Sequence, residues 1–235
     1  MKRGTFNLAV AILAFFIGTA AETIYLIDSA SPIQHLEEPQ PTISPTHFPG
    51  LSVSTRYMGR LLYFPPGALS ANEWHDQFTT DWYSKHLAAM DEHSLYMPGY
   101  IAEECYRFLW LRSFHHPIAV CLWRSGDAHF VHVKQLSGAG GYEPGKLVIN
   151  RTRFLTKGEW DEFIRLLEEA SYWKLPTEDS VIGNDGARWV LEGVRENRYH
   201  IVDRWGPKGG NYREACLYLL GIANLGIDVF GEDIY

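Results

Sequence analysis

The sequence predicts an α+β fold with a mainly antiparallel sheet of about six strands and two or three amphipathic helices. Three observations support this: segments with the alternation and aromatic content of strands, short turns between several of them, and segments with helical apolar spacing. Short turns join antiparallel neighbours, and amphipathic helices bury their apolar side against a sheet. An N-terminal apolar helix and a Pro-rich linker are expected to precede this fold. The predicted strands are 106–114, 118–123, 129–136, 146–154, 188–194 and 199–205.

The composition is that of a globular protein. The chain has 235 residues, of which 46% are hydrophobic, 14% aromatic and 21% charged, and these values exclude a disordered or collagen-like chain. The formal net charge is −7, so the chain lacks the overall basic field that nucleic-acid binding needs, and no nucleic-acid partner is expected. The phosphate-loop and dinucleotide motifs are absent from the sequence, and no cofactor is predicted.

Residues 1–27 predict a signal peptide or a transmembrane anchor. Lys2 and Arg3 precede an apolar run, and the small residues at 18–21 suit cleavage. Residues 5–27 are also long enough to span a bilayer, so both alternatives stay open. Either one exports the remainder of the chain. The prediction is therefore a single-pass cell-membrane protein with an extracytoplasmic C-terminal body, or a secreted or periplasmic protein if the leader is cleaved.

Three further segments follow the leader. Residues 28–50 contain five prolines and predict a Pro-rich linker. Residues 51–104 predict a helical N-terminal extension, and residues 105–235 predict the α+β domain. Within the extension, Ser70 and Glu73 have the spacing of a capping box that starts a helix. The apolar residues that follow it at roughly helical spacing are Trp74, Phe78, Trp82, Leu87 and Met90.

Two more helices are predicted in the α+β domain. Thr156 and Glu159 have capping-box spacing, and an apolar stripe that includes Trp160 follows them. Asn211 is expected to cap a last helix that ends near Asn224. We expect the helices to cover one face of the sheet.

The cysteine count is odd, so the sequence does not predict a disulfide framework. The three cysteines are Cys105, Cys121 and Cys216. Cys105 and Cys121 flank adjacent predicted strands and are the favoured pair in an oxidising compartment. The alternative is that all three are small buried side chains.

Histidines provide one candidate site. Imidazole binds zinc and copper well, and His132 could meet His115 or His116 across neighbouring strands. The alternative is a solvated turn at His115 and His116 and a half-buried sheet histidine at His132.

The predicted hairpin around Glu196-Asn197 provides a second candidate site. A two-residue turn there would place Leu191 opposite Val202 and would bring Glu192 and Asp203 onto one face.

Paired carboxylates can perform general acid–base chemistry, with His200 or His132 as the partner histidine. Glu192 and Asp203 could also be ordinary ion-pairing residues of a sheet surface. The same register places Arg204 over Trp189, where a cation–π contact is expected.

The loop at 206–210 provides a third candidate. Arg204 and Trp205 precede this loop, Lys208 lies in it and Arg213 follows it, at the start of a predicted helix. Cations, glycines and free backbone N–H groups at such a position can bind an anion. A plain strand-to-helix connection is the alternative.

These observations favour an exported or membrane-anchored, non-catalytic binding or assembly protein of the cell envelope. Its partners would be the membrane, through residues 5–27, and a protein of an envelope complex. The contacting surface would be a sheet face left uncovered by helices, or the loop at 206–210. Two alternatives stay open: an envelope hydrolase that uses Glu192 and Asp203 with a histidine, or a metal-binding protein that uses the three histidines.

Overall fold

The computed structural model describes residues 56–57, 60–61, 63–96, 103–179, 181, 183, 185–228, 231 and 234–235. The predicted leader at 1–27 and the predicted Pro-rich linker at 28–50 lie outside the described residues. Within the described part of the chain, no helix has the length and hydropathy of a membrane span.

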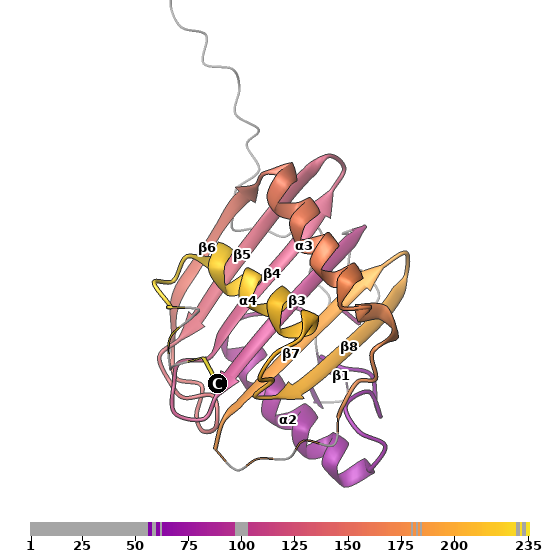
Figure 1. Cartoon of the computed structure of the whole chain (residues 1–235). Coiled ribbons are helices and arrows are strands. Elements are labelled where there is room, and N and C mark those ends of the chain that lie inside the picture. Colours follow the sequence, from indigo (N-terminus) through magenta and orange to yellow (C-terminus); the bar gives the residue numbers. More distant parts are fainter. Residues whose placement is uncertain are drawn as a thin grey trace, which may run out of the picture. The chain divides into compact units, whose positions relative to one another are not determined.

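Six strands form one antiparallel sheet in the spatial order β6-β5-β4-β3-β7-β8 (Figure 1). This confirms the predicted α+β class and all six predicted strands. A separate two-stranded ribbon precedes the sheet, formed by β1 (Arg56–Tyr57) and β2 (Arg60–Leu61). The strands of the large sheet are β3 (Glu104–Arg112), β4 (Ile118–Ser125), β5 (Ala128–Leu136), β6 (Leu147–Leu155), β7 (Ala187–Arg195) and β8 (Arg198–Trp205).

The first face of the sheet packs against α3 (Lys157–Glu169), η1 (Tyr172–Lys174) and α4 (Asn211–Ala223). The predicted capping box is present: the Thr156 side chain accepts from the Glu159 N–H, and the Glu159 side chain accepts from the Thr156 N–H. This box starts α3 in the orientation that turns its apolar stripe to the sheet. The stripe buries Trp160, Phe163 and Leu167.

The second face packs against residues 63–96, which include α2 (Glu73–Ala89). Figure 1 shows α2 on the side of the sheet opposite α3 and α4. The expectation that all helices share one face is therefore wrong. Strand β3 is buried along its whole length because it lies inside the sheet with a helical layer on each side.

Two helix caps differ from the prediction. Asn72, and not Ser70, is the N-cap of α2, and its side chain accepts from the His75 N–H. Gly210 is the N-cap of α4, and it provides no side-chain hydrogen bond. The Asn211 side chain instead donates to the Glu169 carbonyl at the end of α3, so it joins the two helices of the first face.

Both edges of the sheet have polar partners. On β6, the Arg151 guanidinium donates to the carbonyls of Ala223 and Asn224 at the end of α4, where a cation also complements the helix dipole. On β8, the Asp203 N–H donates to the Thr177 carbonyl at 2.7 Å. These contacts satisfy backbone groups that an exposed edge or helix end would leave open to other chains.

The Glu159 cap predicts an acid-sensitive contribution to stability. The Arg153 guanidinium, and then the Thr156 contacts, outweigh partial burial and lower the Glu159 pKa from 4.5 to about 2. Because the folded pKa is the lower one, this stabilisation is complete above about pH 4.5 and is lost as the pH falls toward 2. We expect Glu159→Gln to cost about 1 kcal/mol at pH 7 and almost nothing near pH 2, measured by urea unfolding. The exposed Glu168→Gln serves as the control, and an equal cost at both pH values would contradict the cap's role.

Candidate functional sites

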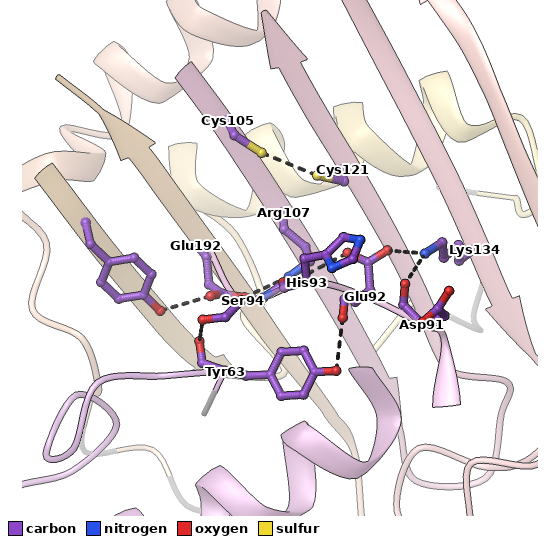
Figure 2. Close-up of polar contacts among 11 residues, drawn as sticks. Tyr63, Asp91, Glu92, His93, Ser94, Cys105, Arg107, Cys121, Lys134 and Glu192 are labelled. Atoms are coloured by element: carbon purple, nitrogen blue, oxygen red, sulfur yellow. Dashed lines mark hydrogen bonds and ion pairs between the residues drawn. The ribbon is translucent and has the colours of Figure 1, made fainter. Parts of the chain in front are cut away.

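A buried ion cluster lies between the second face of the sheet and the segment that follows α2 (Figure 2). Its centre is Arg107 on β3, whose guanidinium contacts Glu192, directly opposite on β7, through Nε at 2.9 Å and Nη2 at 2.6 Å. Its Nη1 lies 3.2 Å from Glu92 Oε2. All three side chains are almost completely inaccessible to solvent. The cluster therefore joins two strands of the sheet to residue 92 in the layer above.

Further contacts attach residues 91–94 to the sheet. The Lys134 ammonium on β5 lies 3.0 Å from Glu92 and donates to the Asp91 carbonyl at 2.9 Å. Arg107 also donates to the His93 carbonyl. The Tyr63 hydroxyl donates to the Glu92 carbonyl at 3.0 Å. The backbone carbonyls of residues 91–93 and the Glu92 side chain are all bonded to other parts of the fold. The cluster therefore determines the path of the chain as it leaves α2.

Burial and ion pairing oppose each other in this cluster. Burial acts to raise the Glu92 pKa, but Lys134 and Arg107 outweigh it, and the net pKa is lowered. Burial likewise acts to lower the Arg107 pKa, but Glu192 and Glu92 outweigh it, and the net pKa is raised. Burial raises the Glu192 pKa, against the opposing effects of Arg107 and the Tyr199 hydroxyl, which donates to Glu192 at 2.9 Å. The arrangement suits a structural anchor, because every charge at its centre has a close partner.

The predicted hairpin has the expected register, with Leu191 opposite Val202 and a turn at Glu196-Asn197, where both φ values are positive. Glu192 and Asp203 lie on the same face, as expected. The structure nevertheless gives them different partners.

Asp203 accepts from the Tyr83 hydroxyl of α2 at 2.6 Å and pairs with Arg188 at 3.5 Å. Burial raises the Asp203 pKa, and Arg188 opposes that effect. His200 lies on the other face, against Tyr172 and Trp173, where burial lowers its pKa. The structure therefore does not bring His200 together with the two carboxylates.

The expected cation–π contact forms between different residues. Although Arg204 lies opposite Trp189 in the register, its guanidinium lies over the Tyr212 ring, 5.7 Å from the centroid. Arg213 of α4 lies over Trp189 instead, at 5.6 Å. The prediction is wrong because Arg204 extends toward the sheet edge, where it donates to the Thr177 carbonyl and so leaves the Trp189 ring to α4.

The three candidate metal-binding histidines have three separate partners. The Nδ1 atom of His115 lies 2.7 Å from the Tyr235 hydroxyl, and that of His116 lies 2.9 Å from the Gly138 carbonyl. His132 Nε2 lies 2.5 Å from the Asn150 side-chain oxygen. Among the residues that the structure describes, no three His, Cys, Asp or Glu side chains are placed to hold one metal ion.

A pocket of about 530 Å³ lies at the loop 206–210. Three of the four predicted binding residues, Arg204, Trp205 and Lys208, line it, whereas Arg213 does not. The Trp205 indole packs closely against the backbone at Gly183, where a Cβ would overlap the ring. The pocket thus combines an aromatic wall with cationic groups. Its lining also includes the acidic residues Asp179 and Asp185.

The sequence did not predict a surface of aromatic rings on α2 and the loop that α2 contacts. Trp74 is 75% exposed and Phe78 is 54% exposed, and their rings stack with centroids 5.7 Å apart. Phe78 contacts the half-buried Trp82, whose indole N–H donates to the Gly140 carbonyl. From the same loop, Tyr142 packs on Phe114, and both are more than half exposed. We call these five residues the aromatic surface.

The buried side of α2 is unusually polar. It includes Asp76, Thr79, Ser84 and His86. Asp76 accepts from backbone N–H groups of residues 67, 69 and 70, and so supports the loop that precedes the helix. The first half of the helix therefore turns Asp76 and Thr79 inward and two large aromatic rings outward, whereas its second half buries Tyr83 and Leu87 in the ordinary way. The polar residues between the aromatic positions were the signal available in the sequence.

Comparison of the chain with models of known families, with curated proteins and with solved structures found no match. The fold and the sites define an antiparallel α+β protein with a helical layer on each face, a buried ion cluster and an exposed aromatic surface.

The ion cluster predicts a strongly non-additive pair of substitutions. Arg107→Met leaves Glu192 buried without its cation, and we expect a loss of about 3–5 kcal/mol in the free energy of unfolding. Adding Glu192→Gln removes that charge but keeps an acceptor for Tyr199, so the double variant should be more stable than the single one. Urea unfolding measures both. The control is Lys157→Ala, which removes an exposed pair with Asp161 and should cost less than about 1 kcal/mol. A double variant less stable than Arg107→Met would contradict this account.

The buried His86 on α2 predicts a second pH dependence of the free energy of unfolding. Burial, aided by Lys85, lowers its pKa from 6.5 to about 4, against the opposing effect of the Gly140 backbone. The neutral imidazole therefore stabilises the fold above pH 6.5, and this stabilisation is lost as the pH falls toward 4.

We expect wild-type protein to lose about 3 kcal/mol more than His86→Leu over this pH range, measured by chemical unfolding. The partly exposed His75→Leu is the control. Parallel pH profiles for wild type and His86→Leu would contradict the assignment.

Proposed function

We propose that the chain is an exported or membrane-anchored, non-catalytic binding or assembly protein of the cell envelope. Residues 5–27 would provide the membrane attachment, or the body would be secreted or periplasmic if the leader is cleaved. The aromatic surface would contact a protein partner in an envelope complex. The observation that carries this proposal is the first half of α2, which exposes Trp74 and Phe78 while it buries the polar side chains of Asp76 and Thr79.

Large exposed aromatic rings are costly to leave in water and valuable in an interface. Transfer of apolar surface out of water contributes about 25 cal/mol per Å², and tryptophan is among the residues that dominate interface energies. Trp74 and Phe78 are already stacked on each other, so a partner would order few additional side-chain torsions when it binds. These properties support a docking role better than a structural one.

Charge next to the aromatic rings indicates the chemistry of the partner. Glu73, Gln77 and Asp81 lie on the exposed side of α2, one residue before each aromatic position, and Gln77 donates to Asp81 at 2.8 Å. Exposed Glu143 lies in the loop that carries Tyr142 and pairs with Lys85 of α2 at 3.6 Å. A partner segment with apolar side chains and Arg or Lys would pair with the carboxylates and place its cations on the tryptophan faces.

The pocket at 206–210 supports a second, smaller contact. Arg204, Trp205 and Lys208 line it and would accept an anionic or aromatic group. It carries less weight than the aromatic surface because Arg204 is already bonded to the Thr177 and Pro176 carbonyls.

Co-purification of the full chain from membranes in mild detergent tests the proposal. We expect Trp74→Ser with Phe78→Ser to reduce the recovered partner by about tenfold or more, because the central apolar contact is lost. The charge variant Glu73→Lys with Asp81→Lys should reduce it by a few-fold. Partner recovery is quantified by mass spectrometry against the recovered chain.

The matched control is Val148→Ser on β6, which removes an apolar side chain that is 56% exposed at a site away from α2. The Trp74/Phe78 and Val148 variants should unfold near the wild-type denaturant concentration, since the substituted side chains are exposed, whereas Glu73→Lys places a cation in the first turn of α2 and should cost about 0.5 kcal/mol. Equal partner recovery by wild type and the Trp74/Phe78 variant would overturn the docking role.

A further inference from the structure

Two cysteine side chains meet on the second face of the sheet. Cys105 on β3 and Cys121 on β4 have their sulfur atoms 3.4 Å apart, and Figure 2 shows the two side chains directed toward each other. They occupy diagonal positions, because Cys105 lies opposite Trp123 and Cys121 lies opposite Arg107. Both are almost fully buried. Cys216 belongs to the core on the first face, so the sheet separates it from the pair.

We infer that Cys105 and Cys121 are a disulfide-forming pair that becomes bridged when the chain folds in an oxidising compartment. The occurrence of the bridge in the cell rests on the proposed export, whereas the capacity to form it rests on the geometry alone. A disulfide needs an S–S distance of about 2.05 Å, so the two sulfurs must approach by about 1.4 Å. Diagonal neighbours on an antiparallel pair have Cα atoms about 7–8 Å apart, at the upper limit for a disulfide, so the bridge requires both rotation of the two side chains and a closer approach of β3 and β4.

The position of the pair determines when the bridge can form. Leu95, Trp123 and Phe130 pack around the two cysteines, and the rings of Trp123 and Phe130 stack at 5.0 Å. Leu95 belongs to the segment that the Arg107 and Lys134 contacts hold to the sheet. The thiol contact with Cys105, together with burial, also raises the Cys121 pKa, which disfavours the reactive thiolate. Oxidation therefore precedes closure of this segment over β3 and β4.

The chemistry is thiol–disulfide exchange with a disulfide donor, which is either a small-molecule disulfide or an oxidised dithiol protein. One cysteine loses its proton to solvent, and its thiolate attacks a donor sulfur, which forms a mixed disulfide and releases one donor thiolate. The second cysteine also loses its proton, and its thiolate displaces the remaining donor sulfur. The chain loses two protons and two electrons, and the donor disulfide takes up both and is reduced to two thiols.

Refolding of the full chain in detergent, in a Cys216→Ala background, tests the pairing. Refolding with oxidised and reduced glutathione should give a product lighter by two hydrogens, about 2 Da, with residues 105 and 121 linked in a non-reduced digest. The same glutathione mixture added to the folded, reduced chain should give at least tenfold slower linkage. The closed loop spans 16 residues, so bridging should lower the unfolding equilibrium constant by about a hundredfold.

Two outcomes of the refolding experiment would overturn the inference: recovery of both thiols, or a glutathione adduct in place of the internal bridge. Cys105→Ser in the same background is the control and should give only adducts or a thiol. Alkylation of the chain directly from cells then separates the two claims. A chain that bridges on refolding but is reduced in cells retains the inferred capacity and contradicts export.

Discussion

The ion pair between Arg107 and Glu192 is the contact on which the second face of the sheet depends. It lies where solvent is absent, so its charges interact strongly with each other but have lost their hydration. Such a pair contributes less to net stability than to specificity, since any arrangement that separates the partners leaves a buried charge unpaired. Glu92 completes the cluster from the layer above, and this contact determines where the chain runs after α2.

Both ends of α2 are fixed by polar contacts, and these determine which side of the helix faces the sheet. At its start, Asp76 accepts three backbone N–H groups from the preceding loop. At its end, Asp91 has a φ of 53° and Lys134 binds its carbonyl, so the chain turns sharply into Glu92. With both ends fixed, Tyr83 and Leu87 point to the sheet and Trp74 and Phe78 point to solvent. The exposed rings are thus a consequence of specific polar packing.

Local signals in the sequence predicted the parts of the fold that local chemistry determines. The capping box at Thr156 and the hairpin at Glu196-Asn197 are each set by a few neighbouring residues, and both were predicted correctly. The orientation of α2 about its own axis was not predicted. Its apolar spacing suggested a buried stripe, whereas the polar contacts of Asp76 and Glu92 determine which side of the helix faces the sheet. The loop 206–210 was chosen for its composition, and the structure forms a pocket there.

The ion cluster shows why the sequence predicted the two carboxylates of the candidate site but not their cationic partners. Glu192 and Asp203 were predicted to share one face because a single turn is enough to derive the register of a hairpin, and that register is correct. Two buried carboxylates on one face nevertheless each need a cation, and these cations lie on other positions of the sheet.

Arg107 is 85 residues from Glu192 and becomes its neighbour only because β3 pairs with β7, a long-range pairing that the turns do not determine. The signal available was Arg107 itself, a charge in the interior of β3, whose other charged residues lie at the two ends of the strand. A cation at such a position implies a buried carboxylate on an adjacent strand, and this requirement would have selected β7 as the neighbour of β3.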